Sequence, residues 1–398
     1  MNHSSNLSPP PPRRGLALQL GPAMVARLVL NTSRRMLYIF APAFSRGLGV
    51  PLTSITSLIA INQASGILGP LFGPLGDRWG YRLMMLVGLS AASVGLLAAG
   101  VLPFYAVIVM AVFLIGFAKS VFDPALQAYV GEQVPYHRRG LVMGLIELPW
   151  AGSALVGIPL VGLLISRIGW QSPFLVLGAV GLLCLIMIGL LIPSDAQPQQ
   201  RRPAGIRQAW RQLAQEPAAL TALAFTFLMT AANDTLFVVY GVWLESAFGL
   251  TVVALGASTI VIGVAELLGE GLTLSIADRV GLWRSVVFGL TLTGLSYLLL
   301  PVVAHTLPLA LVGLFLIFVT FEFSIVTSFS IFTEILPGAR GTMMATNMAA
   351  ASVGRMAGAL VGGLVWMVGG LQAVSLVAAG ASGLALVCMV WGLRAWRP

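Results

Sequence analysis

Long, uninterrupted apolar runs are the feature that most constrains how this chain can fold. Runs of about 18 or more apolar residues recur along its length, and each is long enough to cross a hydrocarbon core about 30 Å thick as a helix. Because the runs are continuous and do not alternate, they favour helices over the strands of a β-barrel. Charged residues make up 9% of the chain, too few to cover a soluble fold of this size, since soluble domains have about a quarter. We therefore predict an all-α polytopic membrane protein.

The runs predict twelve transmembrane helices, arranged as two pseudo-symmetric six-helix bundles. The polar segment 193–216 separates the halves, and its residues 206–213 are expected to form a short interfacial helix. The expected parts are a disordered cytoplasmic tail at 1–23, an N-terminal bundle at 24–192, a cytoplasmic linker at 193–216, a C-terminal bundle at 217–393 and a cytoplasmic tail at 394–398. The expected spans are 24–45, 53–76, 83–102, 105–130, 141–166, 170–192, 217–244, 251–276, 285–303, 306–333, 342–367 and 371–393.

The distribution of basic residues predicts the orientation of the spans. With both termini on one side of the membrane, the loops of that side hold 15 of the 22 Lys and Arg residues, and the opposite loops hold only Arg46 and Arg167. Because Lys- and Arg-rich loops stay in the cytoplasm, both termini and the linker are expected there, with the chain multi-pass in the cell membrane. The net charge of +9 then reflects topology, and we expect no nucleic-acid partner.

A charged motif recurs in the two halves at an offset of 201 residues. Gly73–Arg82 reads GPLGDRWGYR, and Ala277–Arg284 reads ADRVGLWR. The offset is about half of the 398 residues, which indicates a duplicated six-helix unit in one orientation. Such duplication is typical of transporters, whose substrate site lies between the repeats. The residues expected to form a cytoplasmic gate are Gly73, Asp77, Arg78, Gly80, Arg82, Asp278, Arg279 and Gly281.

Eleven ionisable side chains fall inside the predicted spans. A charge at mid-membrane costs about 2.5–3.5 kcal/mol, so eleven such groups facing lipid would cost on the order of 30 kcal/mol. They must therefore face one another or a wet cavity, and a central polar pathway is expected. The alternative is that some are fixed ion pairs that lock helices together. The acids are Asp123, Glu147, Asp234, Glu266, Glu270 and Glu322, and the bases are Arg27, Arg34, Arg35, Lys119 and Arg355.

Helical spacing places several of these groups on shared faces. Lys119 and Asp123 lie at i and i+4 of the fourth span, and Glu266 and Glu270 lie at i and i+4 of the eighth. Because two carboxylates at that distance do not both ionise readily in a low dielectric, we expect one of the glutamates to hold a proton. Arg27, predicted near the cytoplasmic end of its span, is expected to snorkel to the interface.

Two neighbouring arginines and five aromatic residues complete the expectations for the central pathway. Only one of Arg34 and Arg35 is expected to face the centre well, and we assign that place to Arg35. Five aromatic residues have two interpretations. They form an aromatic wall of the cavity, or they serve in ordinary packing or in an aromatic belt. These residues are Trp150, Tyr240, Trp243, Phe321 and Phe323.

These motifs resemble those of the major facilitator superfamily. GPLGDRWGYR is similar to the family's signature in the loop between spans two and three, whereas the second copy has Leu274 in place of the first glycine and its basic residue one position late. SALVGIPLVG in span five loosely resembles the glycine–proline motif of the drug-efflux branches. Lys119 stands near a basic position of many proton-coupled members, where arginine is usual. The resemblance extends over the chain from about residue 20.

The resemblance implies two six-helix bundles that rock around a midplane cavity. Spans one, four, seven and ten would line the cavity, and spans two, five, eight and eleven would form the moving interface. The lining would then include Arg35, Lys119, Asp123, Asp234 and Glu322, with Glu147, Glu266, Glu270 and Arg355 on or beside the path.

The function favoured by this pattern is secondary active transport by alternating access, most simply proton-coupled export of a small organic solute or drug-like compound. Glu266 and Glu270, with Asp123 and Glu147, are the candidate proton carriers, and Lys119, Arg35 and Arg355 would supply counter-charge or bind anionic groups. Uptake or facilitated diffusion of a sugar, organic acid or lipid-like solute is the alternative. A membrane enzyme or sensor is a remote third, because no ligand cluster, phosphate loop or nucleophile motif supports it.

The partners expected are a small-molecule substrate, protons as coupling ion and the lipid bilayer. We expect no cofactor and no metal, and a monomer. The opening motif would act as a latch, in which Asp77 accepts hydrogen bonds from the start of span eleven near Thr342. By the repeat, Asp278 would contact the start of span five at Leu141. Both contacts would hold the outward-facing state.

Overall fold

The computed structural model describes residues 14–134, 142, 145–193, 206–336 and 340–393. Within these ranges the regular structure is helical and contains no strand. The first half comprises α1 (Arg14–Ile39), α2 (Ala41–Leu48), α3 (Leu52–Ala64), η1 (Ser65–Leu68), α4 (Gly69–Trp79), α5 (Tyr81–Val101), α6 (Tyr105–Gln133), α8 (Pro149–Gly152), η2 (Ser153–Gly157), α9 (Ile158–Arg167) and α10 (Ser172–Leu191). The rest comprises α11 (Ile206–Gln215), α12 (Pro217–Phe237), α13 (Tyr240–Phe248), α14 (Val252–Leu272), η3 (Thr273–Ala277), α15 (Asp278–Val280), α16 (Leu282–Val303), α17 (Leu307–Ile335), α18 (Arg340–Val387) and η5 (Cys388–Gly392).

These elements form the twelve predicted spans. Ten stretches of the described chain are long and apolar enough to cross a membrane. One of them, Thr342–Gly392, crosses twice because the backbone of α18 leaves helical geometry at Gly369 and Gly370. The remaining span is α1, which is less apolar because it holds three arginines within nine residues.

The first span begins earlier than predicted. Residues 14–23 were expected in a disordered tail, but α1 starts at Arg14, so this part of the tail prediction is wrong; residues 1–13 lie outside the described range. Gly15, Gly21 and Pro22 are poor helix formers, so helix propensity did not predict that the first span extends back to Arg14. In the linker, α11 covers the interfacial helix expected at 206–213.

Turns at the ends of the spans repeat between the halves. Gly80 and Gly281, the glycines shared by the two charged motifs, have φ of 92° and 94° and directly precede α5 and α16. A side chain at this backbone conformation is strained, so the motif requires glycine there. The other positive-φ glycines also pair at about the same offset: Gly49 with Gly249, and Gly169 with Gly370.

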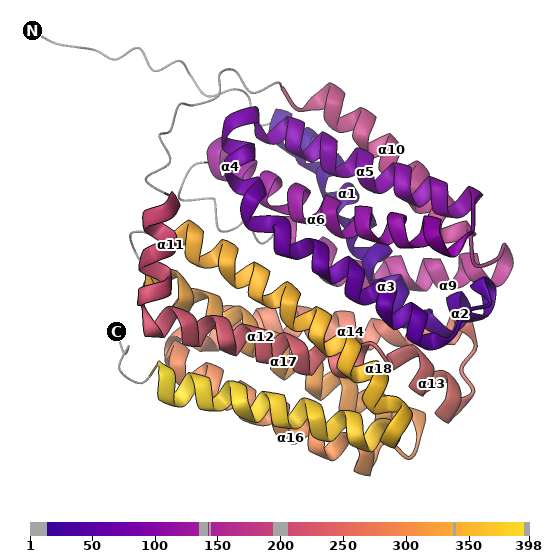
Figure 1. The fold of residues 1–398 in the computed structure, drawn as a ribbon, viewed down its shortest axis with the longest axis vertical. Helices are drawn as coiled ribbons and strands as arrows, with labels where there is room; N and C mark the ends of the chain where they lie inside the picture. The colour runs from indigo at the N-terminus through magenta and orange to yellow at the C-terminus, as the bar shows by residue number, and fades with distance from the viewer. Residues whose placement is uncertain (1–13, 135–141, 143–144, 194–205, 337–339, 394–398) are drawn as a thin grey trace, which may run out of the picture.

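The halves pack against each other through the spans expected at their interface. Figure 1 shows the two bundles, with α3 and α18 running side by side and α14 close to α9. In the same view α11 lies at one end of the molecule, and α2 and α13 lie at the opposite end. We call these the α11 end and the α2–α13 end.

Close backbone contacts join the halves at the α2–α13 end. Gly241 at the start of α13 lies so near Ile39 that a Cβ atom on Gly241 would sit 2.0 Å from the Ile39 carbonyl oxygen. Arg46 of α2 pairs with Glu245 of α13 at 2.6 Å. The described hydrogen bonds between the halves also lie at mid-depth or toward this end, such as Thr259 Oγ1 to the carbonyl of Ala154. This end is therefore closed.

The closure predicts a strong effect of one added methyl group. Gly241→Ala is expected to push α13 away from α1, because the new Cβ has no room, and to cost about 1–3 kcal/mol. Pulsed electron paramagnetic resonance between spin labels on α2 and α13, together with thermal unfolding, measures both effects. Gly380→Ala is the matched control, since a Cβ at Gly380 meets no atom within 4 Å. An unchanged label distance in Gly241→Ala would contradict this packing.

Candidate functional site

A cavity of about 420 Å³, counting its open mouth, lies between the two halves. Among the described residues, no side chain of α6 contributes to its wall, although span four was expected to line it. Helices from spans two, five, eight and eleven line it together with spans one, seven and ten. The lining residues are Arg34, Arg35, Tyr38, Gln63, Trp150, Asn233, Phe237, Glu266, Phe318, Phe321, Glu322 and Arg355.

An ion pair crosses between the halves at this cavity. Arg35 Nη2 of α1 lies 2.5 Å from Glu266 Oε1 of α14, and both side chains are at most 6% exposed. In a membrane interior an unpaired charge is costly, so each member stabilises the ionised form of the other. The contact exists only while α1 and α14 remain at this separation, which links the pair to the arrangement of the halves.

A second polar link crosses the interface one turn further along α1. The Tyr38 hydroxyl donates to Asp234 Oδ1 at 2.6 Å and accepts from Gln63 Nε2 at 2.6 Å. Arg355 of α18 lies 3.2 Å from the other oxygen of Asp234. Asp234 is fully buried, and it is held behind the cavity wall by these contacts.

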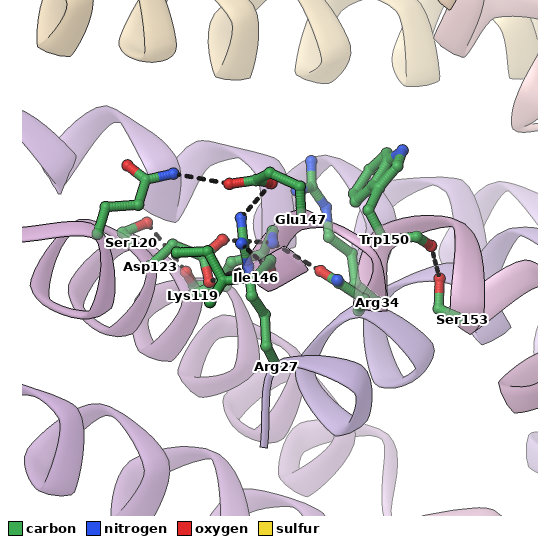
Figure 2. A network of polar contacts seen from close by, with 12 residues as sticks. Arg27, Arg34, Lys119, Ser120, Asp123, Ile146, Glu147, Trp150 and Ser153 are labelled. Carbon is green, nitrogen blue, oxygen red and sulfur yellow. Dashed lines mark hydrogen bonds and ion pairs between the residues drawn. The ribbon is translucent and has the colours of Figure 1, made fainter. Parts of the chain in front are cut away.

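Arg27 is the centre of a separate cluster inside the N-terminal half, shown in Figure 2. Its guanidinium contacts Glu147 Oε2 at 2.6 Å and Asp123 Oδ1 at 3.3 Å, and it also donates to the carbonyl of Ile146. The residue is only 4% exposed. The prediction that Arg27 snorkels to the interface is therefore wrong, because α1 extends back to Arg14 and places Arg27 deep in its span.

Lys119 completes this cluster. Its Nζ lies 2.6 Å from Asp123 Oδ2, as the i, i+4 spacing predicted, and also donates to Asn31 Oδ1 at 2.6 Å. Gln127, one turn further on, donates to Glu147 Oε1 at 3.0 Å. All of these contacts join α1, α6 and the start of span five within one half. We call the cluster of Arg27, Asn31, Lys119, Asp123, Gln127 and Glu147 the N-half cluster.

Trp150 stands between the N-half cluster and the cavity. The Arg35 guanidinium lies 4.1 Å from its ring centroid, Lys119 Nζ lies 5.5 Å away and the Arg355 guanidinium lies 5.9 Å away. Cations within about 6 Å of an indole face are attracted to its ring. One aromatic side chain thus offsets part of the mutual repulsion of three cations from spans one, four and eleven.

Three charged side chains at or beside the cavity have no ion-pair partner among the described residues. Arg34 donates only to the side-chain oxygen of Gln63, which is neutral. Glu322 lines the cavity and is 9% exposed, yet no basic group lies within 4.0 Å of it. Glu270, one turn from Glu266 on α14, is also without a partner in this part of the chain. Since Arg34 and Arg35 both line the cavity, the expectation that only one of them faces the centre is wrong.

Of the five aromatic residues considered for the cavity wall, some line the cavity and the others pack elsewhere in the protein. Trp150 and Phe321 line the cavity, whereas Tyr240, Trp243 and Phe323 are buried elsewhere. Sequence reasoning missed Tyr38, Gln63, Asn233, Phe237 and Phe318. Tyr38 follows Asn31 and Arg35 on one helical face, so the spacing held the signal for it, but Gln63 is recognisable only from its neighbours on another helix.

The gate residues are only partly within the described structure. Gly80 and Gly281 form the turns described above, Arg82 donates to the carbonyl of Gly189, and Arg78 and Arg279 are exposed. Leu141 and the side-chain environments of Gly73, Asp77 and Asp278 lie outside the described residues. The latch therefore stays a prediction.

Within the described ranges, no group of three or more His, Cys, Asp or Glu residues is placed to hold a metal ion.

The chain matches known transporters in sequence and in fold. The family model of the Major Facilitator Superfamily matches residues 23–332. The MFS-type transporter YceJ of Bacillus subtilis (strain 168) is 28% identical over 74% of this chain and 75% of that protein. The multidrug resistance protein MdtG of Serratia proteamaculans (strain 568) is 27% identical over 66% of each chain. The crystal structure of a mutant of the nucleoside transporter NupG has the same fold, with a TM-score of 0.77, 14% identity and coverage of 94% of this chain and 99% of that one.

The N-half cluster predicts a large loss of stability when its central cation is removed. Arg27→Met removes a buried partner of Asp123, whose side chain is 16% exposed, and breaking a buried pair costs about 3–5 kcal/mol. Denaturant unfolding in detergent measures the loss. Arg46→Met is the matched control: the Arg46 and Glu245 side chains are 59% and 29% exposed, and such pairs contribute about 0–1 kcal/mol. Equal losses in the two variants would contradict the assignment.

Proposed function

The chain belongs to the Major Facilitator Superfamily, and we propose that it exports a small organic solute by alternating access, in exchange for protons that move inward. The observation that carries this proposal is the Arg35–Glu266 ion pair, which joins the halves at the cavity. A pair that spans the moving interface can change its partner during the cycle, which is what a coupling group must do.

The proposed coupling follows from the cost of a bare charge. When the halves rock apart at the cavity, Glu266 loses Arg35 and becomes an uncompensated carboxylate in a low dielectric, which is unfavourable. Uptake of a proton by Glu266 removes that cost. Glu270 lies one helical turn nearer the α11 end on the same face and would pass protons between Glu266 and the solution at that end.

The carboxylates of the N-half cluster are assigned a different role. Asp123 and Glu147 contact Arg27 and Lys119 within a single half, so their partners move with them when the halves move as rigid bodies. We assign these two acids to structural stabilisation. Arg355 likewise serves as counter-charge to Asp234 inside the C-terminal half.

The orientation of the proposed cycle rests on the arginine distribution. Basic residues concentrate in the loops on the side of the linker, which supports a cytoplasmic location for the α11 end. The closed α2–α13 end would then face outward, and the described form would be inward-facing. Glu270 lies on the cytoplasmic side of Glu266 in this assignment. A cell membrane location is part of the same proposal.

Export is supported by the relatives. MdtG is named a multidrug resistance protein, and removal of a compound from the cell is the simplest route by which a transporter confers resistance. Uptake remains the alternative outcome, because the residues of the cavity do not encode direction.

Everted membrane vesicles test the proposal with ciprofloxacin and ethidium as probes. With an acidic interior, protons leave through the transporter and the probe should accumulate inside. One pH unit is worth about 1.4 kcal/mol per proton. A gradient of one pH unit is therefore expected to give about tenfold accumulation for each proton exchanged. Glu266→Gln and Glu270→Gln should reduce accumulation to the level of empty vesicles.

The matched control is Glu245→Gln, which removes another carboxylate that pairs across the halves but lies at the α2–α13 end; it should still accumulate probe. Accumulation in wild-type vesicles that persists after nigericin collapses the gradient would contradict proton coupling. Proton-driven loss of preloaded probe from the same vesicles would indicate uptake.

A further inference from the structure

The cavity contains one acidic and one basic side chain that lack an ion-pair partner, on opposite halves. Arg34 of α1 has only the neutral side chain of Gln63 as a hydrogen-bond partner, and Glu322 of α17 has no basic group within 4.0 Å among the described residues. The other charged lining residues, Arg35, Glu266 and Arg355, are already paired. The site is therefore not simply cationic or anionic.

Neither of these two side chains has a protein counter-charge for its ionised form. Both residues line the same cavity, and the ionised form of each is stabilised by a partner of opposite sign and by hydrogen bonds. A purely cationic ligand would compensate Glu322 and leave Arg34 uncompensated, and a purely anionic ligand would do the reverse. A ligand that carries both charges compensates both residues.

The rest of the wall indicates the body of the ligand. Phe237, Phe318 and Phe321 line the cavity from the C-terminal half, and the rings of Phe237 and Phe318 lie 5.6 Å apart in an edge-to-face arrangement. Aromatic rings are large apolar surfaces that pack well on other rings. The face of Trp150 is covered by Arg35, so the aromatic surface available to a ligand lies beside Glu322.

We propose that the transported solute is a zwitterion with an aromatic or apolar body between its two charges. Its anionic group binds the Arg34 guanidinium of the N-terminal half, its cationic group binds the Glu322 carboxylate of the C-terminal half, and its body packs on Phe318 and Phe321. Because the two ends bind different halves, the ligand itself bridges the moving interface. This inference rests on the proposed transport function and specifies its substrate class.

A matched set of three probes tests the charge requirement without any gradient. Ciprofloxacin is a zwitterion with an aromatic core between its carboxylate and its ammonium; its methyl ester keeps only the cation, and N-acetylciprofloxacin keeps only the anion. Isothermal titration calorimetry on the full-length purified protein at neutral pH should show ciprofloxacin binding at least tenfold more tightly than either derivative.

Variants then assign each charge to its residue. Arg34→Gln should weaken ciprofloxacin at least tenfold and leave the ester within about twofold, whereas Glu322→Gln should weaken both. Arg34→Lys, which keeps the charge, should recover most of the affinity, and thermal unfolding reports whether each variant is folded. Glu245→Gln, remote from the cavity, should bind all three probes as the wild type does.

Several results would overturn the inference. An ester that binds wild type as tightly as ciprofloxacin and is indifferent to Arg34→Gln would define a cation site. Tightest binding by N-acetylciprofloxacin would define an anion site, and failure of folded wild type to bind any of the three would also reject the zwitterion. The binding measurements involve no proton gradient. If the three probes bind in the expected order but transport does not depend on the gradient, proton coupling is rejected and the zwitterion inference stands.

Discussion

The structure depends on one constraint: a charge inside a membrane must find a partner or a wet surface. Eleven ionisable groups lie within the spans, and most of them are paired with one another. The pairs differ in where their members come from. Arg27, Lys119, Asp123 and Glu147 belong to one half, whereas Arg35 and Glu266 belong to two. Pairs inside a half stabilise that half, and a pair between halves is sensitive to their separation.

The duplicated architecture explains why charged side chains from both halves meet at the cavity between them. Turns at Gly80 and Gly281, at Gly49 and Gly249, and at Gly169 and Gly370 recur at nearly one offset, so each half positions its spans in the same way. When two such halves pack, the same helices of each meet at the interface, and polar residues on those helices converge on one cavity. The specific charges differ between the halves, so the cavity is asymmetric although the scaffold is not.

The sequence was sufficient to predict the scaffold, since apolar runs, the repeated motif and the arginine distribution are local signals. It also predicted the Lys119–Asp123 contact, because four residues on one helix fix that geometry. It failed for Arg27, whose depth depends on where α1 begins and whose partners come from distant helices. The Arg35–Glu266 and Tyr38–Asp234 contacts join residues about two hundred positions apart, and no spacing rule reaches that far.

The central claim is that the acids at the interface and cavity exchange protons, whereas Asp123, which pairs with Arg27 and Lys119 inside one half, does not. Infrared difference spectroscopy of the reconstituted protein, taken between neutral and mildly acidic pH, tests this most directly by following the stretch of protonated carboxyl groups. We predict that the band of the wild type is lost in the triple variant Glu266→Gln, Glu270→Gln, Glu322→Gln and retained in Asp123→Asn. A band that survives in the triple variant would place the titrating groups elsewhere and contradict the account.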